Sequence, residues 1–190
     1  MIKNIVQFIE NIIGLNLSAD NYLSIVSIII AVVGGFFALH QWKKSTKIKC
    51  AEYINELTET IRTDNFIKDT IYIMEYDQHW YDENFHESGI LEFKIDKTLS
   101  YFSYICYLKE NKVISDKEFK FFEYQTHRIL NNPGVQDYLY NLYHFSKRND
   151  SCITFYYLFK YAQNHEFIDK EFYNPNSYKN SDKYNKYLNW

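Results

Sequence analysis

The sequence predicts an all-α protein in which a single N-terminal transmembrane helix continues into a cytoplasmic helical bundle of about four to five helices. Three observations favour this fold class. The 190 residues include only 5 Gly and 2 Pro, which disfavours a turn-rich β fold. Residues 22–41 form an apolar run without Asp, Glu, Lys or Arg. Much of the remaining chain repeats apolar residues at helical spacing.

The N-terminal segment, residues 1–17, places its apolar side chains on one helical face, which predicts an amphipathic helix lying in the membrane interface. It does not resemble a signal peptide, because polar residues interrupt its apolar run and no small-residue cleavage site follows. A second, imperfect span is the alternative interpretation of this segment. The apolar positions are Ile2, Ile5, Val6, Ile9, Ile12 and Ile13.

Residues 22–40 are predicted to form the transmembrane helix. At a rise of 1.5 Å per residue, about 18 apolar or small residues reach roughly 27–30 Å, the thickness of the hydrocarbon core. Tyr22 and Trp42 lie at the two ends of the run, where amphipathic rings favour the membrane interface. Asp20 is the expected N-cap of this helix.

The charges around the run predict its orientation. Several lysines follow it, whereas Lys3, Glu10 and Asp20 precede it. Positive charge stays on the cytoplasmic side, so we expect the N-terminus outside and the C-terminal domain in the cytoplasm. The same lysines would contact anionic lipid headgroups. The predicted membrane-surface residues are Trp42, Lys43, Lys44, Lys47 and Lys49.

Small residues recur along the predicted span. Ser27, Ala31 and Gly35 lie at positions i, i+4 and i+8, and Gly34 and Ala38 widen this stripe. Such a stripe lets two helix backbones approach closely, so it predicts self-association into a homo-oligomer. The alternative is that these residues have no special role, since Gly and Ala are common in transmembrane helices.

Residues 41–168 are predicted to form the cytoplasmic helical domain, and residues 169–190 a flexible polar tail without periodicity. Ser115 and Glu118 form a capping-box pattern that starts a helix, and the turn at 131–134 ends it. Apolar periodicity places the other elements. They cover residues 43–62, 66–74, 90–109, 135–146 and 151–163.

Few side chains suggest chemistry. His79, Asp82, Glu83 and His86 would share one face of a helix and could bind a divalent ion, but their segment has no apolar stripe and is better interpreted as a solvated acidic loop. Cys106 lies in an apolar stripe and is expected to pack rather than react. Neither a nucleophile motif nor a Gly-rich phosphate loop occurs, so we expect no enzyme activity, metal or cofactor.

Two histidines and the overall composition leave open interpretations. His127 and His144 lie on separate predicted helices and could meet in space, although satisfied histidines of a bundle are the simpler reading.

The net charge of -3 argues against nucleic-acid binding, for which Lys147, Arg148 and the Lys/Tyr tail are the candidates. The aromatic share of 19% predicts an aromatic core or interaction surface, or else reflects codon bias. Three isolated cysteines fit a reducing cytoplasm.

Four stretches carry a resemblance to a known family. They are QWKKSTKIKCAEYINELTETI, IKDTIYIMEY, KIDKTLSYFSYICYLKENKVISDKEF and NNPGVQDYLYNLY, within residues 26–145. The pattern resembles an uncharacterised family of bacterial single-pass membrane proteins, a domain of unknown function with an N-terminal span and a cytoplasmic helical domain. The resemblance implies the bacterial inner membrane and variable loci that include prophage and anti-phage islands. It supplies no catalytic residues.

These observations lead to a functional hypothesis and two rivals. The leading hypothesis is a membrane-anchored, non-enzymatic effector or accessory protein of anti-phage defence, acting by oligomerisation and membrane disruption with a cytoplasmic protein partner encoded nearby. The second is a constitutive membrane tether or scaffold for a cytoplasmic partner. The third is a metal-dependent enzyme that uses His79 and His86.

Overall fold

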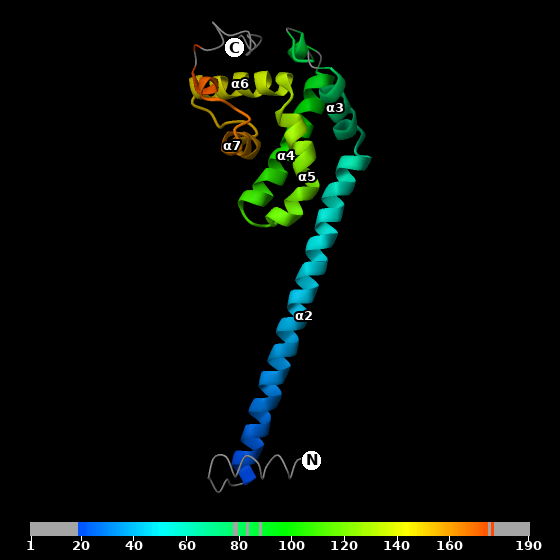
Figure 1. Ribbon diagram of the computed structural model, residues 1–190, viewed down its shortest axis with the longest axis vertical. Helices are drawn as coiled ribbons and strands as arrows, with labels where there is room; N and C mark the ends of the chain where they lie inside the picture. The colour runs from blue at the N-terminus through cyan, green and yellow to red at the C-terminus, as the bar shows by residue number, and fades with distance from the viewer. Residues whose placement is uncertain (1–18, 78–79, 83, 88, 175, 177–190) are drawn as a thin grey trace. The chain divides into compact units, whose positions relative to one another are not determined.

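The computed structural model describes residues 19–77, 80–82, 84–87, 89–174 and 176. In this part of the chain every regular element is a helix, so the all-α prediction is confirmed (Figure 1). The chain divides into two compact units, Met1–Glu52 and Tyr53–Trp190. The amphipathic helix predicted for residues 1–17 lies outside the described residues.

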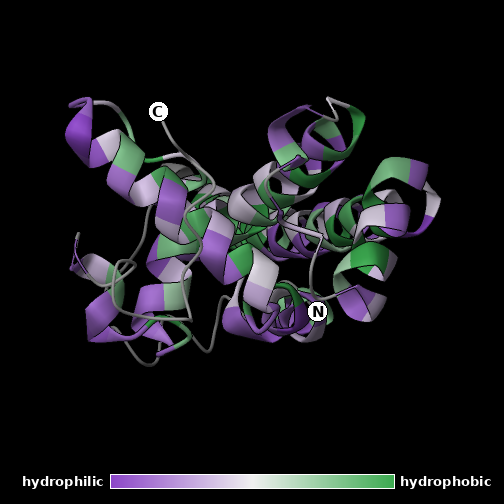
Figure 2. Ribbon diagram, turned by 90° about the horizontal axis from the view of Figure 1, so that it is seen from above, coloured by the Kyte–Doolittle hydropathy of each residue, from purple (hydrophilic) through white to green (hydrophobic). Residues whose placement is uncertain are grey.

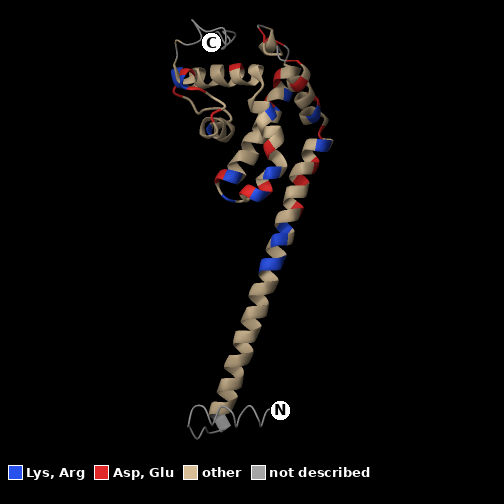
Figure 3. Ribbon diagram, viewed as in Figure 1, with Lys and Arg blue, Asp and Glu red and all other residues tan. Residues whose placement is uncertain are grey.

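Helix α2, Ala19–Thr63, contains the predicted span and the predicted helix 43–62 as one continuous element. No proline interrupts these 45 residues, which agrees with the expectation that the two helices join. In the first unit the apolar side chains surround the helix and are exposed; Phe36 and Phe37, for example, are each 73% exposed. No charge occurs between Asn21 and Gln41, and lysines then follow (Figure 3).

The second unit is a helical domain in which α3, α5, α6 and η2 begin with side-chain caps. Helix α3, Asn65–Tyr76, follows Asp64, whose carboxylate accepts hydrogen bonds from the N–H groups of Phe66 and Ile67. Helix α5, Asp116–Leu130, starts at the predicted capping box of Ser115 and Glu118. Asn132 caps the next helix by accepting from the Val135 N–H. The remaining elements are η1 (Phe85–Glu87), α4 (Ile90–Glu110), α6 (Pro133–Arg148), α7 (Tyr156–Asn164) and η2 (Lys170–Tyr173).

Helix α4 lies at the centre of the helical domain and packs against α3, α5 and α7. Its inner positions Ile95, Leu99, Phe102 and Ile105 are 0% exposed, as the predicted stripe requires. Hydrophobic and hydrophilic residues alternate along the ribbons of the domain's helices, as expected when one face of a helix is buried (Figure 2). Burial of these one-sided apolar faces against each other is therefore the main source of the domain's stability.

The last helix begins later than predicted. Residues 151–155 are not helical, and α7 starts at Tyr156 rather than at residue 151. Phe155 adopts a left-handed conformation with φ 54°, which an α-helix does not permit. The Ser146 hydroxyl also donates a hydrogen bond to the Cys152 carbonyl, so this segment turns back towards the end of α6 instead of winding into a helix.

The predicted boundary at residue 168 was placed too early. Asp169 caps η2 by accepting a hydrogen bond from the Phe172 N–H, and Phe172 is only 1% exposed. Its ring packs edge-on against Tyr140 at 5.3 Å between ring centroids. Residues 169–174 therefore belong to the helical domain, because one buried aromatic side chain fixes a segment whose composition is otherwise polar. The rest of the predicted tail, except Asn176, lies outside the described residues.

The loop before α4 is also more buried than the prediction of a solvated acidic loop implies. Trp80, Tyr81 and Phe85 are 4%, 4% and 1% exposed. Their rings contact one another and Tyr138 at centroid distances of 5.2–6.3 Å. The described part of this loop therefore contributes an aromatic cluster to the core.

Candidate functional site

The predicted association stripe lies on the exposed part of α2. Ser27, Ala31, Gly34, Gly35 and Ala38 are all exposed, and no atom lies within 4 Å of a Cβ built on either glycine. The Ser27 hydroxyl donates to the Leu23 carbonyl at 2.8 Å, which satisfies it within its own helix. The stripe is therefore free to contact a second helix, and self-association stays a prediction.

The predicted membrane-surface residues follow directly. Trp42 is 66% exposed, and Lys43, Lys44, Lys47 and Lys49 are exposed along the same helix. Within the described residues, one helix (Asn21–Thr63, with a window of mean hydropathy 2.4) is long and apolar enough to cross a membrane. Membrane anchors and N-terminal signal sequences share this length and composition. The structure thus shows one long apolar helix near the N-terminus, of the kind found both in membrane anchors and in signal sequences.

The proposed metal cluster does not assemble in the part of the loop that the structure describes. His79 and Glu83 lie outside the described residues. His86 Nδ1 lies 2.8 Å from Glu92 Oε1, and the Asp82 carboxylate accepts a hydrogen bond from the Asn84 N–H. Over the described ranges, no group of three or more His, Cys, Asp or Glu side chains is placed to hold a metal ion.

The two bundle histidines have separate partners. His127 Nε2 lies 3.0 Å from the Tyr161 hydroxyl, and His144 Nε2 lies 2.7 Å from the Phe172 carbonyl oxygen. Burial lowers the pKa of both imidazoles, because it disfavours the charged form. The simpler prediction, two satisfied histidines of a bundle, is confirmed.

A carboxylate–tyrosine pair on α4 and α6 was not anticipated from the sequence. The Tyr138 hydroxyl donates to Asp96 Oδ1 at 2.8 Å, and burial raises the pKa of the Asp96 carboxyl. Glu92 lies one helical turn before Asp96. Asn141, which lies close to Tyr138 in the sequence, donates a hydrogen bond to the Tyr81 hydroxyl at 2.9 Å. Two acids four residues apart on a partly buried helix were the available signal. The Tyr138–Asp96 bond joins α6 to α4, and the Asn141–Tyr81 bond ties the aromatic loop to α6, so both have a structural role.

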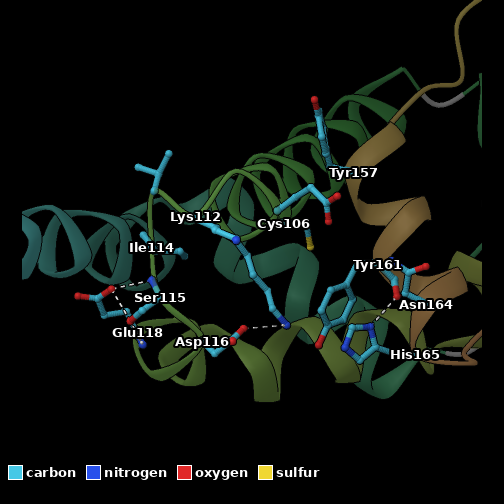
Figure 4. A pocket seen from close by; sticks show the side chains of 13 residues that line it. Cys106, Lys112, Ile114, Ser115, Asp116, Glu118, Tyr157, Tyr161, Asn164 and His165 are labelled. Carbon is cyan, nitrogen blue, oxygen red and sulfur yellow. Dashed lines mark hydrogen bonds and ion pairs between the residues drawn. The ribbon is translucent and has the colours of Figure 1, made fainter.

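A cleft of about 540 Å³ lies between the end of α4, the following loop and α7 (Figure 4). Lys109 is one of the two lysines that line it. Its Nζ lies 4.3 Å from the Phe119 ring centroid and 4.8 Å from that of Tyr161, and 3.9 Å from Asp116 Oδ1. Aromatic rings and a carboxylate therefore already satisfy this charge.

The side chains that line this cleft do not form a catalytic arrangement. Cys106 is 3% exposed, and burial raises the pKa of its thiol to about 12. A nucleophilic cysteine needs the opposite shift, so this thiol is inert at neutral pH, as the packing prediction expects. His165 stacks on Tyr161 at 4.0 Å between centroids, and its Nδ1 lies 2.9 Å from the Tyr161 carbonyl oxygen. This histidine therefore faces its own helix end rather than the thiol.

Comparison of the chain with protein-family models, with curated proteins and with solved structures finds no match. The family resemblance described above therefore stays a prediction, and the functional argument depends on the residues of this chain.

Proposed function

We propose that the protein is a single-pass membrane protein of the bacterial inner membrane that holds a non-enzymatic helical domain at the cytoplasmic face. One observation carries this proposal: residues 22–41 are uncharged, all of them except Tyr22 and Ile25 are exposed, and a group of lysines follows them. Exposed apolar side chains on all sides prefer lipid to water. The lysines favour the cytoplasmic side for the end that they occupy.

The test is membrane fractionation of the full chain together with reporter fusions. We expect the chain in the membrane fraction, released by detergent but not by alkaline carbonate, and a C-terminal fluorescent reporter that is active in the cytoplasm. Replacing Ile29 and Val33 with Lys should move the chain to the soluble fraction, because each charge at mid-span costs about 3 kcal/mol. The matched control, Leu at both positions, should stay in the membrane.

Two outcomes would overturn this proposal. One is recovery of the full chain without detergent, and the other is an active periplasmic reporter at the C-terminus. A mature chain that begins after the apolar run would instead identify a cleaved signal sequence, which mass spectrometry of the purified protein would detect.

The helical domain carries exposed aromatic side chains that suit a protein partner. Tyr72, Tyr76, Phe93, Phe121 and Tyr124 are each more than half exposed. Large aromatic side chains at the surface are enriched in the energetic centres of interfaces. This supports a tether that positions a cytoplasmic partner, for which removal of the span should relocate the partner and leave the membrane intact.

A second function, an anti-phage effector that oligomerises and disrupts the membrane, is favoured by the small-residue stripe. A single apolar helix cannot line a water-filled path, so this function requires oligomers. Gly35→Leu should disturb the stripe, whereas Val33→Leu, on the opposite side of the helix, should not. We expect dye entry into induced cells to fall for Gly35→Leu alone. Intact membranes under every inducing condition, including phage infection, would remove the disruptive role and leave the tether.

A further inference from the structure

Five tyrosines form a continuous row on the surface of the helical domain, and we call them the tyrosine row. The hydroxyl of Tyr53, in the part of α2 that belongs to this domain, lies 2.7 Å from the Tyr104 hydroxyl on α4. Tyr104 stacks on Tyr107 at 6.1 Å between ring centroids, and Tyr107 meets Tyr157 on α7 edge to face at 4.9 Å. Tyr156 lies 5.2 Å from Tyr157. The row thus joins three helices, and Tyr104, Tyr107 and Tyr156 remain 46%, 37% and 48% exposed.

The α7 end of the tyrosine row already has its cation. Lys160 lies one helical turn after Tyr156 and Tyr157, so it shares their side of the helix. Its Nζ lies 2.6 Å from Glu110 Oε1 on α4. Tyrosines, a cation and a carboxylate therefore lie together at this end, and the positive and negative charges neutralise each other.

The α2 end of the tyrosine row has a carboxylate without a cation. Glu56 is exposed and lies one turn after Tyr53, on the same side of α2. Burial and the bond to Tyr104 raise the pKa of Tyr53, and the nearby Glu56 carboxylate adds to this shift. Among the residues that the structure describes, no Lys, Arg or His side chain pairs with Glu56. This end of the row is therefore an aromatic surface with a net negative charge.

Another part of the domain shows which group such a surface accepts. The Arg128 guanidinium lies over the Tyr124 ring at 5.3 Å from its centroid and pairs with the Glu75 carboxylate. A guanidinium suits both contacts, because it is planar, stacks on aromatic faces and can bind a carboxylate through two parallel hydrogen bonds. The α2 end of the tyrosine row has the ring and the carboxylate of this arrangement but lacks the guanidinium. Its negative charge also disfavours the phosphates of nucleic acids and of anionic lipids.

We propose that the tyrosine row binds an arginine-containing segment of a cytoplasmic protein partner, with one guanidinium paired with Glu56 beside the Tyr53 and Tyr104 rings. Charge complementarity selects this occupant over an acidic or an uncharged one. The other rings of the row offer the segment apolar area, and tyrosine and arginine are enriched among the residues that dominate binding energy at interfaces. This proposal names the partner chemistry of the tether described above, and it rests on that function only for the compartment in which the partner is met.

The test is fluorescence anisotropy of a labelled peptide with the full chain in a nonionic detergent at about 0.15 M salt. The probe is an amidated decapeptide of alternating Arg and Ser, and its control replaces every Arg with citrulline, which has a similar shape without the charge. We expect saturable binding of the Arg peptide and about tenfold weaker binding, or none, of the citrulline peptide. Absence of binding of the Arg peptide up to about 1 mM, or equal binding of the two peptides, would overturn the proposal.

Matched variants assign the binding to the tyrosine row. Glu56→Gln and Tyr104→Ala should each weaken binding of the Arg peptide about tenfold, because one removes the carboxylate and the other removes a ring. Their controls, Glu171→Gln on η2 and Tyr72→Ala on α3, change an exposed acid and an exposed tyrosine and should bind like the parent. If each variant binds as tightly as its control, the row is not the binding surface.

Photo-crosslinking of the Arg peptide to the unsubstituted chain keeps the proposal testable even if a variant does not fold. We expect mass spectrometry to identify cross-links on α2 near Glu56 and on α4 near Tyr104. Cross-links confined to other surfaces would contradict the proposal. A dimer of the chain that Tyr104→Ala dissociates would also contradict it, because a second copy would then be the occupant. Membrane fractionation tests the anchor separately, so failure of peptide binding and failure of anchoring are distinguishable.

Discussion

Isoleucine, leucine and phenylalanine have opposite surroundings in the two units of the chain. In the first unit Leu23, Ile30 and Phe36 are 66–73% exposed, whereas in the second unit Ile95, Leu99 and Phe102 are 0% exposed. The residue types are the same, and both sets lie on helices. The difference is their distribution around the helix. Apolar residues on all sides cannot be covered by one neighbouring helix, whereas a one-sided stripe can.

Polar groups show the same contrast. In the first unit the Ser27 hydroxyl is satisfied by its own helix, as a helix surrounded by lipid requires. In the second unit Asn132 bonds to residues 52 and 58 positions away, Trp80 and Met74. The Ser27 hydrogen bond needs only residues of its own helix, whereas the Asn132 hydrogen bonds need residues that are distant in the sequence. We therefore expect a substitution in one unit to leave the stability of the other unit unchanged.

The largest expected effect is on the domain core. Phe102→Ala removes a fully buried ring from the centre of α4 and should lower the free energy of unfolding of the helical domain by about 3–5 kcal/mol. Urea denaturation of the full chain in mild detergent, followed by near-ultraviolet circular dichroism, measures it. The matched control Phe36→Ala removes an equally large ring from the first unit and should leave the domain transition unchanged. A similar loss of unfolding free energy in both variants would contradict the expectation that the two units are independent.

A charge in the apolar run should impair membrane insertion and leave the stability of the helical domain unchanged. Ile30→Arg places a guanidinium near the middle of the predicted span, which costs about 3 kcal/mol in membrane insertion. We expect the inserted fraction to fall in an assay of membrane-integrated chain, while the domain unfolds as before. Ser18→Arg, near the predicted edge of the span, is the control and should insert normally. Equal insertion of the Ile30→Arg chain would argue that residues 22–40 do not span.

Asn132 tests the long-range polar contacts. Its Oδ1 accepts from the Trp80 indole N–H and the Val135 N–H, both at 3.0 Å, and its Nδ2 donates to the Met74 carbonyl at 2.6 Å. Asn132→Ala removes a helix cap and leaves buried partners unpaired, so we expect a loss of about 2–3 kcal/mol in urea denaturation. Asn131→Ala, at the exposed neighbouring position, should cost much less. If the two substitutions cost the same, the long-range bonds do not stabilise the domain.

Local chemistry explains which elements the sequence alone could predict. The start of α5 was predictable because Ser115 and Glu118 satisfy each other within one turn. The inner face of α4 was predictable because Leu99, Phe102 and Cys106 follow one helical period. By contrast, Phe172 and Trp80 looked like parts of polar segments, and only contacts with distant residues bury them.

The same limit applies to the candidate sites. The stripe at Ser27, Ala31 and Gly35 can be found in a short window, since its spacing is that of one helix. The partners of the two histidines could not be found in that way, because His127 and Tyr161 lie 34 residues apart and His144 and Phe172 lie 28 apart. Two satisfied histidines were expected, but which residues satisfy them depends on the three-dimensional fold.

The smallest expected effect is at the capping box, where the interaction is local even within the domain. Glu118 Oε2 accepts from the Ser115 N–H at 2.7 Å, while the Ser115 hydroxyl is 3.3 Å from the Glu118 N–H. Ser115→Ala should cost about 1 kcal/mol and lower the melting temperature of the domain by about 4 °C. Ser115→Asp restores an acceptor at the N-cap, next to the positive end of the helix dipole, and should recover most of this loss. If Ser115→Asp has the same melting temperature as Ser115→Ala, the cap contributes little and packing alone fixes the start of α5.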